Sequence, residues 1–483
     1  MAKTNNAVRI RRKLMVEIAR LFRNGRLCED IDRLPLQMAP REGDSVRCCI
    51  YKDRAVLKYR AMSLLGFGLE EETDELTTLG QYAAEAQARR HAPSADPSVL
   101  DIACASCTKE SHLVTDACRG CVARPCTTAC PKGAIQVING RAVIDQERCV
   151  NCGLCVKECA FHAIIYRPVP CEEACPVDAM EKDSRGRVRI DRDKCIACGR
   201  CLTACPFSAV MDRSQMVDVL SSLERGEKVV AAVAPAGIGQ FSAPFEQLVS
   251  ACRVLGFHEV HEVAATADLV ARRESAELAE RLDAGAAFMT SSCCPAWTES
   301  VRRHLPGLGP YVSETPTPMA LSAEQLRHRD PSARIVFLGP CLAKKREAAA
   351  DPNIDYVLTF EELGAMFVAA DIDVQECTPI QADTVGGACG RGFPVSGGVG
   401  AAVQAALGST REVSTAVVDG LTRETVKELR RVEKSPEDPA RRPEGAQFLE
   451  VMGCAGGCVG GPLAYGAPKS AARAVKKQAV SVG

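Results

Sequence analysis

The second half of the chain alternates between patterns of buried strands and patterns of amphipathic helices. Residues 228–234 form an apolar run typical of a buried strand, and residues 245–255 repeat apolar positions at helical spacing. Further strand patterns, with helical segments between most of them, lie at residues 286–290, 334–338, 354–359 and 447–452. This alternation predicts an α/β architecture with parallel sheets.

The first part of the chain shows helical patterns only. Residues 11–23 and 51–65 carry helical patterns, and residues 91–98 form a loose stretch with two prolines. We therefore predict a mainly helical block over residues 1–98, which could dock onto or cap the rest of the chain. The block contains the adjacent pair Cys48–Cys49; such a pair, without further ligands nearby, is more often structural than chemical.

Cysteine is the residue whose abundance changes this picture. The chain has 27 cysteines in 483 residues, and many lie in C-x-x-C runs rather than at the dispersed spacing of a secreted disulfide framework. The sequence shows no signal-peptide pattern and no apolar run of about 18 residues that could span a bilayer. Because the thiols must stay reduced and the sequence shows neither an export signal nor a membrane span, we predict a cytoplasmic protein without a membrane partner.

Charge and aromatic content argue against nucleic acid as a partner. The 60 basic side chains are balanced by 61 acidic ones, and aromatic residues make up 4% of the chain, with one tryptophan. Neither a basic surface for phosphates nor stacking platforms for bases are expected from this composition.

Residues 99–213 contain 16 of the cysteines. The bacterial ferredoxin spacing, in which the fourth cysteine serves the other of two clusters, is present at Cys195, Cys198, Cys201 and Cys205. Two more runs repeat or resemble this spacing, at Cys149, Cys152, Cys155 and Cys159 and at Cys118, Cys121, Cys126 and Cys130. An apolar pair follows each run, which indicates an internal repeat of small β-α units and an α+β ferredoxin-like domain.

Two fragments, Cys104–Cys107 and Cys171–Cys175, cannot hold a cluster alone but together supply four ligands. Exchange of the fourth cysteine between runs then predicts four 4Fe–4S clusters. Their ligand sets are Cys118, Cys121 and Cys126 with Cys159; Cys149, Cys152 and Cys155 with Cys130; Cys104, Cys107 and Cys171 with Cys205; and Cys195, Cys198 and Cys201 with Cys175. Zinc is the alternative occupant of such cysteine sets, but it rarely takes three cysteines at this spacing followed by Cys-Pro.

Three short motifs, each just after a predicted strand, carry cysteines in the second half of the chain. They read TSSCCPAW at residues 290–297, GPCLAKKRE at residues 339–347 and EVMGCAGGCVGGP at residues 450–462. In this order behind a ferredoxin-like region, they resemble the FeFe hydrogenases, over at least residues 100–465. The segment RCCIYK at residues 47–52 resembles the monomeric group B branch of that family.

The resemblance and the patterns together imply three domains. An α/β catalytic domain, with two lobes of parallel sheet flanked by helices, is expected over residues 214–483. The α+β ferredoxin-like multi-cluster domain over residues 99–213 and the mainly helical N-terminal block over residues 1–98 precede it.

Four thiolates from the three motif loops can hold one 4Fe–4S cube: Cys294, Cys341, Cys454 and Cys458. The resemblance implies that the thiolate of Cys458 also bridges to a two-iron subsite with carbon monoxide, cyanide and dithiolate ligands, which completes an H-cluster. It further implies that Lys344 donates to a cyanide and that the same cavity is lined by Met452 and by the backbone at Ala234, Pro235 and Ala236. Glu347 is expected to be a structural partner close to the cofactor.

Proton supply is assigned to a cysteine beside the ligands. Cys293 is next to a ligand without being one, and a thiol of tuned pKa can act as acid or base. We expect the route behind it to consist of Glu274, Ser313, Glu277 and Arg281. The helical spacing of Glu277 and Arg281 also fits an ordinary ion pair on a solvated face. The positions of the four residues, however, match the family's relay one for one.

The predicted function is that of a hydrogenase that reversibly reduces protons to molecular hydrogen. Electrons would pass through the 4Fe–4S clusters to or from a soluble carrier such as ferredoxin, and maturation proteins would install the two-iron subsite. The alternatives are a slow hydrogen sensor and an iron–sulfur assembly protein that shares the fold. Departures from the common family pattern at Gly339, Ala343 and Leu463 bear on rate, direction and oxygen tolerance, while the ligands are unchanged.

Overall fold

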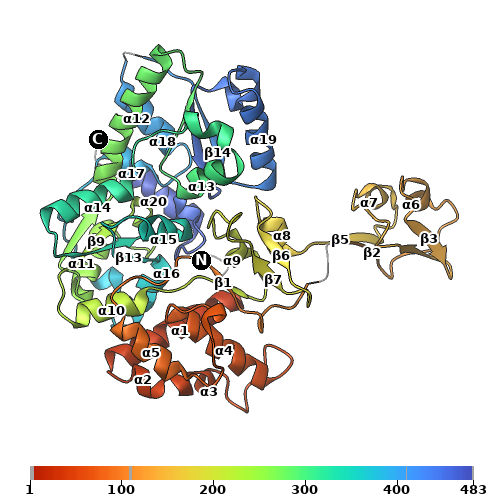
Figure 1. Ribbon diagram of the computed structural model, residues 1–483, viewed down its shortest axis with the longest axis horizontal. Coiled ribbons are helices and arrows are strands. Elements are labelled where there is room, and N and C mark those ends of the chain that lie inside the picture. Colours follow the sequence, from red (N-terminus) through yellow and green to blue (C-terminus); the bar gives the residue numbers. More distant parts are fainter. Residues whose placement is uncertain (1–4, 108–110, 410, 481–483) are drawn as a thin grey trace.

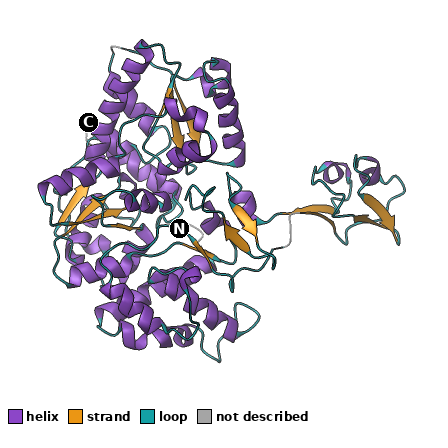
Figure 2. Ribbon diagram, in the orientation of Figure 1, coloured by secondary structure: helices purple, strands orange, loops and turns teal. Residues whose placement is uncertain are grey.

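Two parallel sheets form the centre of the second half of the chain in the computed structural model, which describes residues 5–107, 111–409 and 411–480. The first sheet has the strand order β10-β9-β12-β13 and the second the order β11-β15-β14, and all of their pairings are parallel (Figures 1 and 2). Their bounds are β9 (Val229–Val233), β10 (Glu259–Glu262), β12 (Arg334–Leu338), β13 (Tyr356–Leu358), β11 (Met289–Thr290), β15 (Phe448–Met452) and β14 (Thr415–Asp419).

Burial on both faces explains which strands the sequence pattern predicts. Every residue of β9 and β15 is buried, as expected for central strands of a parallel sheet that helices cover. Two edge strands, β10 and β14, were not predicted, whereas the edge strands β11 and β13 coincide with predicted strand patterns. In β14, exposed and buried positions alternate, and β10 contains Glu259 and His261, so neither strand has a continuous apolar run.

Helices cover both sheets and pack between them. Their bounds are α10 (Met216–Glu224), α11 (Phe245–Leu255), α12 (Ala264–Asp283), α13 (Pro295–His304), α14 (Pro318–Arg329), α15 (Leu342–Ala349), α16 (Phe360–Ala369), α17 (Ala388–Gly392), α18 (Gly398–Leu407), α19 (Arg423–Lys434) and α20 (Pro468–Val480). Over the described residues, none of the helices is both long enough and apolar enough to cross a bilayer.

The N-terminal block is helical and packs against the first sheet's helices, with bounds α1 (Asn6–Arg23), α2 (Leu27–Asp30), α3 (Leu34–Met38), α4 (Ile50–Leu64) and α5 (Leu79–Ala88). The contact between α1 and α16 centres on Glu361, which is buried and forms ion pairs with Arg11 and with Arg12. The pair with Arg12 has a length of 2.9 Å. A buried charge with two partners holds this block in one position relative to the sheets.

In its described residues, the cysteine-rich region consists of four short antiparallel strand pairs and four short helices. The pairs are β1 (Ser98–Val99) with β8 (Val210–Met211), β2 (Ser111–Val114) with β5 (Ile164–Arg167), β3 (Ile135–Ile138) with β4 (Arg141–Ile144) and β6 (Met180–Lys182) with β7 (Val188–Ile190). The helices are α6 (Pro125–Thr128), α7 (Leu154–Glu158), α8 (Pro170–Ala174) and α9 (Arg200–Ala204).

This region divides into two repeats of the same design, as the internal repeat predicts. The outer repeat, residues 111–167, projects away from the rest of the molecule, whereas the inner repeat, residues 98–107 and 168–211, lies against the two parallel sheets with their helices and against the N-terminal block (Figure 1).

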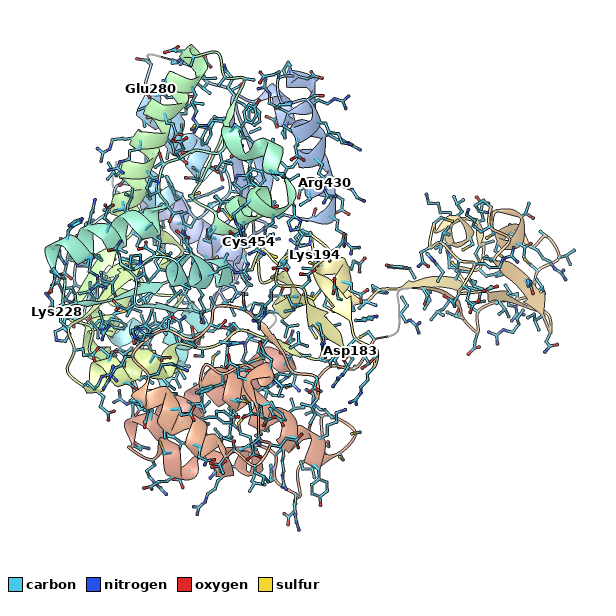
Figure 3. All side chains as sticks on the ribbon, in the orientation of Figure 1. Asp183, Lys194, Lys228, Glu280, Arg430 and Cys454 are labelled. Carbon is cyan, nitrogen blue, oxygen red and sulfur yellow. The ribbon has the colours of Figure 1, made fainter. Side chains whose placement is uncertain are left out.

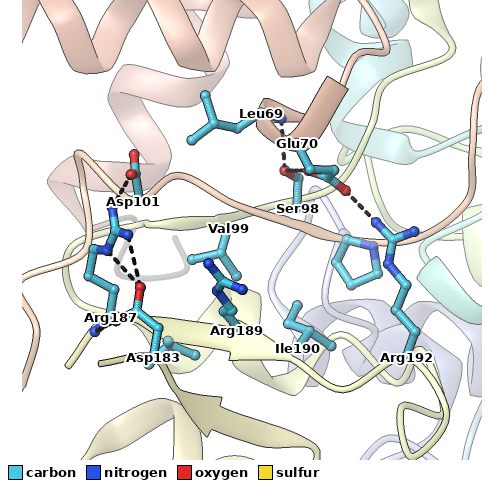
Figure 4. Close-up of a pocket in the computed structure, with 12 residues that line it drawn as sticks. Leu69, Glu70, Ser98, Val99, Asp101, Asp183, Arg187, Arg189, Ile190 and Arg192 are labelled. Carbon is cyan, nitrogen blue, oxygen red and sulfur yellow. Dashed lines mark hydrogen bonds and ion pairs between the residues drawn. The ribbon is translucent and has the colours of Figure 1, made fainter. Parts of the chain in front are cut away.

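A cavity of about 360 Å³ lies where the inner repeat meets the N-terminal block (Figure 4). On one side Arg187 bridges Asp101 and Asp183, and on the other the Ser98 hydroxyl donates to Glu70 at 3.0 Å. Because these contacts join three segments of the chain, they fix the inner repeat relative to the helical block.

Candidate active site

The three cysteine motifs follow three strand ends that meet at one place. Cys294 precedes α13 directly after β11, Cys341 precedes α15 after β12, and Cys454 and Cys458 follow β15. The carboxyl ends of parallel strands open onto a common edge, where ligand sites of such sheets lie. One cavity is lined by all four cysteines and by Cys293, and Figure 3 shows Cys454 at the middle of the molecule.

The thiols in this cavity affect one another. Burial raises the pKa of Cys341 to about 11 and that of Cys458 to about 12, and the nearby thiol of Cys294 adds to both shifts. Four thiolates this close need a positive partner, which an iron–sulfur cube supplies. The donor set therefore fits a 4Fe–4S cube.

Glycine is required where the third motif turns. Gly457 has a φ of +88°, and a Cβ at this position would lie 2.4 Å from the carbonyl oxygen of Pro394. Since other residues rarely adopt this conformation, the turn that brings Cys454 and Cys458 to the same cavity depends on glycine.

Lys344 lines the cavity from α15 and is held by two groups. Its Nζ donates to the Thr317 hydroxyl at 3.0 Å and forms an ion pair with Glu347 at 2.7 Å. Burial works against the charge of Lys344, but the Glu347 carboxylate keeps its pKa above the usual value. The structure thus pairs Glu347 with Lys344, and adds Thr317, which no sequence motif pointed to.

Only some of the other residues that were expected to line the cavity do so in the structure. Met452 and Ala234 line the cavity. Pro235 and Ala236 lie one and two residues further on, in a short 3-10 turn, and are not among the residues that line it.

Phe337 explains why glycine stands at position 339. The Phe337 ring lines the cavity, and a Cβ at Gly339 would lie 2.5 Å from an atom of that ring. Phenylalanine therefore takes up the volume that a larger residue before Pro340 would need. The sequence motifs did not indicate this residue, because it lies inside the apolar run of β12.

The residues of the expected proton route form two hydrogen-bonded groups behind the cavity. The backbone amide and hydroxyl of Ser292 donate to Glu274, which is fully buried, at 3.0 and 3.1 Å. The Ser313 hydroxyl donates to Glu277 at 2.6 Å, and Arg281 forms an ion pair with Glu277 at 2.6 Å.

The outer end of this route is in solvent. The guanidinium of Arg281 lies 3.7 Å from the carboxylate of Glu314, whose side chain is 91% exposed. The interpretation of Glu277 and Arg281 as an ordinary ion pair on a solvated face does not account for the buried glutamate one turn away. All four route residues and Cys293 thus lie in one region.

The pKa values of the two glutamates are shifted in opposite directions. Burial raises the pKa of Glu274 to about 7. Burial also acts on Glu277, but hydrogen bonds from Ser313 and the Glu314 amide and the charge of Arg281 together lower its pKa. Two carboxyl groups whose pKa values are separated in this way are suited to opposite roles in proton transfer.

Cys293 is a protonated thiol in this setting. Burial raises its pKa well above the usual value, and the Glu274 carboxylate adds to the rise, followed by Cys294 and Cys458. A second buried carboxylate, Glu450 in β15, contributes as well. Glu450 accepts hydrogen bonds from the amides of Gly397 and Gly400, both at 2.8 Å; its position in the sequence did not indicate this role.

The outer repeat contains two cysteine cavities with the predicted membership. One cavity is lined by Cys118, Cys121, Cys126 and Cys159, and another by Cys130, Cys149, Cys152 and Cys155. Each cavity is largely apolar, which suits a cofactor that is held by thiolates.

In the inner repeat, cysteines within each predicted set lie close enough to affect one another's pKa. Burial raises the pKa of Cys171 to about 11, and the nearby thiols of Cys205 and Cys107 add to the rise. Burial also raises the pKa of Cys198 to about 12, here with the help of Cys175 and Cys195. These neighbours are those of the two predicted sets.

The inner repeat also touches the active-site cavity. Cys198 lines that cavity, and a Cβ at Gly199 would lie 2.6 Å from the ring of Pro462 in the third motif. The loop that carries one predicted cube is therefore in direct contact with the loop that carries Cys454 and Cys458.

These features define an iron–sulfur protein in which an α/β domain gathers five cysteines and a lysine beside a chain of cysteine-rich repeats. Comparison with known families agrees: residues 227–462 match the C-terminal domain of the iron-only hydrogenase large subunit, residues 141–164 a 4Fe–4S binding domain and residues 165–216 an LdpA Fe–S cluster-binding domain. Residues 227–462 thus form a domain of the FeFe hydrogenase family. The chain binds 4Fe–4S clusters and has the H-cluster domain.

The chain is similar to several curated proteins. It is 27% identical over 384 residues to iron hydrogenase 1 of Clostridium pasteurianum, which covers 68% of this chain and 66% of that protein. It is 26% identical to the periplasmic [Fe] hydrogenase large subunit of Nitratidesulfovibrio vulgaris, over 52% of this chain and 72% of that protein. A cytosolic Fe–S cluster assembly factor of Eremothecium gossypii is 25% identical over 40% of this chain and 56% of its own length.

Similar solved structures are hydrogenases as well. A structure of the FeFe hydrogenase HydA1 of Chlamydomonas reinhardtii aligns with a TM-score of 0.43 and 25% identity, over 53% of this chain and 84% of that one. The chain spans 51% to 72% of the length of the hydrogenases among its curated relatives.

Proposed function

We propose that this protein is an FeFe hydrogenase that interconverts protons and molecular hydrogen and exchanges electrons with a soluble carrier. The observation that carries the proposal is the position of Cys293. This protonated thiol lines the same cavity as the four predicted ligands, beside a buried glutamate and a route to solvent. An assembly factor has no need for a proton route into its cluster site.

The residues of the chain divide the work in the proposed mechanism. Cys294, Cys341, Cys454 and Cys458 would hold the cube, and Lys344 would anchor the two-iron subsite, which supplies the metal chemistry for hydrogen when bound. Lys344 is fixed for this task by Thr317 and Glu347, and a fixed donor in a dry cavity stabilises charge more strongly than one in water.

Proton movement is the task of the side chains behind the cavity. The Sγ of Cys293 would hold the proton nearest to the reacting centre, and Glu274 would replace it from within the protein. Ser313 would pass protons between Glu274 and the ionised Glu277, and Arg281 would keep Glu277 ionised at the surface end. The pKa of Glu274, at about 7, lets this group take up and release protons near neutral pH.

Infrared spectroscopy tests the proposal directly. After expression with the maturation proteins, we expect bands from iron-bound carbon monoxide and cyanide, together with hydrogen turnover in both directions. A sample that contains iron–sulfur clusters but lacks these bands would contradict the proposal and favour the alternative of an iron–sulfur assembly protein. Bands with turnover too slow for metabolism would favour the hydrogen sensor.

The outer repeat is the surface at which we propose that the carrier binds. It exposes apolar side chains next to its cysteine cavities, among them Val122 at 99%, Val150 at 58% and Phe161 at 50% exposure. Its residues 111–167 contain seven lysines and arginines against four aspartates and glutamates. An acidic carrier protein with an apolar contact patch complements this surface.

The assignment of the protein to the group B branch of the family and its location in the cytoplasm remain predictions.

Reversing charge on the outer repeat should slow electron exchange. Lys132 lines the cavity of Cys149, Cys152 and Cys155, and the guanidinium of Arg148 donates to the Lys132 carbonyl oxygen at 3.0 Å. For Lys132→Glu with Arg148→Glu, we expect kcat/KM with an acidic carrier to fall by about tenfold at low salt, and the loss to shrink at high salt, because surface charge mainly steers association.

The matched control is Lys469→Glu with Lys476→Glu, which makes the same change of charge on α20 of the catalytic domain. It should leave the carrier's kcat/KM near the wild-type value. An equal loss in both pairs would show that net charge, rather than the outer repeat, governs the encounter.

A further inference from the structure

Cys48 and Cys49 are two adjacent thiols at the surface, outside all the predicted cluster sets. Both are exposed, and their sulfur atoms lie 3.9 Å apart. They stand at the end of a polar loop, directly before α4. Two solvent-facing thiols in contact form a dithiol, which can react as a unit with other sulfur compounds.

The position of Cys49 makes it the more reactive thiol of the two. It is the residue before the first turn of α4, with extended backbone angles (φ −166°, ψ 163°). The backbone amide of Lys52, in the first turn of α4, lowers its pKa, and Cys48 contributes to the same shift. The thiolate is the attacking form of cysteine, and thiols at helix N-termini reach it more easily.

The dithiol is connected to one of the predicted cluster sets through two arginines. Arg47, next to Cys48, donates to the carbonyl oxygen of Phe207 at 3.4 Å. Arg60, on α4, donates to the same oxygen at 3.2 Å and to the Ser208 carbonyl oxygen at 3.3 Å. Phe207 and Ser208 follow Cys205 after a single proline, so these hydrogen bonds join the segment of the dithiol to the backbone beside a predicted ligand.

We propose that Cys48 and Cys49 are a vicinal dithiol site that exchanges with small-molecule disulfides, and that its closure changes the surroundings of the cube predicted at Cys205. The Cys49 thiolate attacks one sulfur of the external disulfide, forms a mixed disulfide and expels one thiolate. Cys48 then displaces the second thiolate from Cys49. The two cysteines lose two electrons, the external disulfide gains them, and the two thiol protons go to the two released thiolates.

Closure at adjacent residues is strained and therefore reversible. Neighbouring Cα atoms across a trans peptide are about 3.8 Å apart, below the usual range for disulfide-bonded cysteines of about 4.4 Å or more. Strained and exposed disulfides are the ones that thiols reopen readily. Because Arg47 is the next residue along the chain, its contact with Phe207 must adjust when the ring forms.

Mass spectrometry after alkylation tests the exchange on the full chain with its cubes in place. With glutathione disulfide, we expect both thiols of the Cys48–Cys49 peptide to become resistant to iodoacetamide, and dithiothreitol to restore both. C48S should instead stop at a glutathione adduct on Cys49. Full alkylation of both thiols after treatment, or the absence of the adduct in C48S, would overturn the proposal.

C389S is the control, since Cys389 is exposed and lies outside the dithiol. It should close the Cys48–Cys49 ring as the wild type does. If the ring failed to close in C389S as it does in C48S, the loss would be a general effect of replacing a cysteine, and this result would contradict the assignment.

Redox titration of the cubes by electron paramagnetic resonance tests the link to Cys205. We expect one cube to change its midpoint potential when the ring closes in the wild type, and no change in C48S under the same treatment. Identical titrations of open and closed protein would overturn the link. Neither experiment requires the H-cluster, so the outcome is independent of hydrogenase activity.

Discussion

Replacing Cys293 with alanine is expected to lower hydrogen turnover by about 10³-fold or more, in both directions, with the cubes intact. General acid–base groups contribute about 10² to 10⁴-fold to catalysis, and Cys293 is the only one of the five active-site cysteines that we do not assign as a ligand. Its thiol is protonated, since burial and then the Glu274 carboxylate raise its pKa. Turnover and iron content, measured on the same samples, check this prediction.

Two further variants make the result specific. Cys293→Ser keeps a small polar side chain but offers a much weaker acid, so it should be about as impaired as the alanine variant. Cys389→Ala removes an exposed cysteine elsewhere and should be as active as the wild type. Full activity of Cys293→Ala with intact infrared bands would rule out the thiol as the proton donor.

Glu274→Gln is expected to remove both the pH dependence near neutrality and about 10² to 10⁴-fold of the activity. The folded-state pKa of Glu274 is raised from 4.5 to about 7, mainly by burial. In the wild type, hydrogen oxidation needs the ionised form and should rise with pH through about 7. Proton reduction needs the protonated form and should fall through the same range. Rate profiles in both directions, from about pH 5 to 9, measure these limbs.

The same shift has a consequence for stability with a defined sign. Between the ordinary value of 4.5 and the folded value of about 7, the folded protein binds more protons than the unfolded chain. Stability is therefore lost as pH rises through this window, by about 3 kcal/mol at most. Glu274→Gln should lose this part of the pH dependence of Tm, while Glu280→Gln, on the outer face of the same helix (Figure 3), should retain it. An unchanged Tm profile in Glu274→Gln would contradict the assigned pKa.

The sequence predicted what depends on local pattern and on cysteine spacing. The strands β9, β12 and β15 are mainly apolar because both of their faces are buried, and the cysteine sets follow from the repeat. The pattern missed β14, because one side of this edge strand is exposed. It also missed Thr317 and Phe337, since a hydroxyl that holds Lys344 and a ring that takes the volume beside Gly339 are defined only by contacts across the fold.

The outer repeat has a property that concerns how such proteins change over time. Its first and last strands pair with each other, Ser111 opposite Arg167, so the chain enters and leaves this unit at neighbouring points. All eight cysteines of its two predicted cubes lie between Cys118 and Cys159. The unit thus takes no ligand from the rest of the molecule and gives none to it. A gene could gain, lose or exchange the outer repeat in one step. Such a change would alter the length of the electron path without disturbing the catalytic domain.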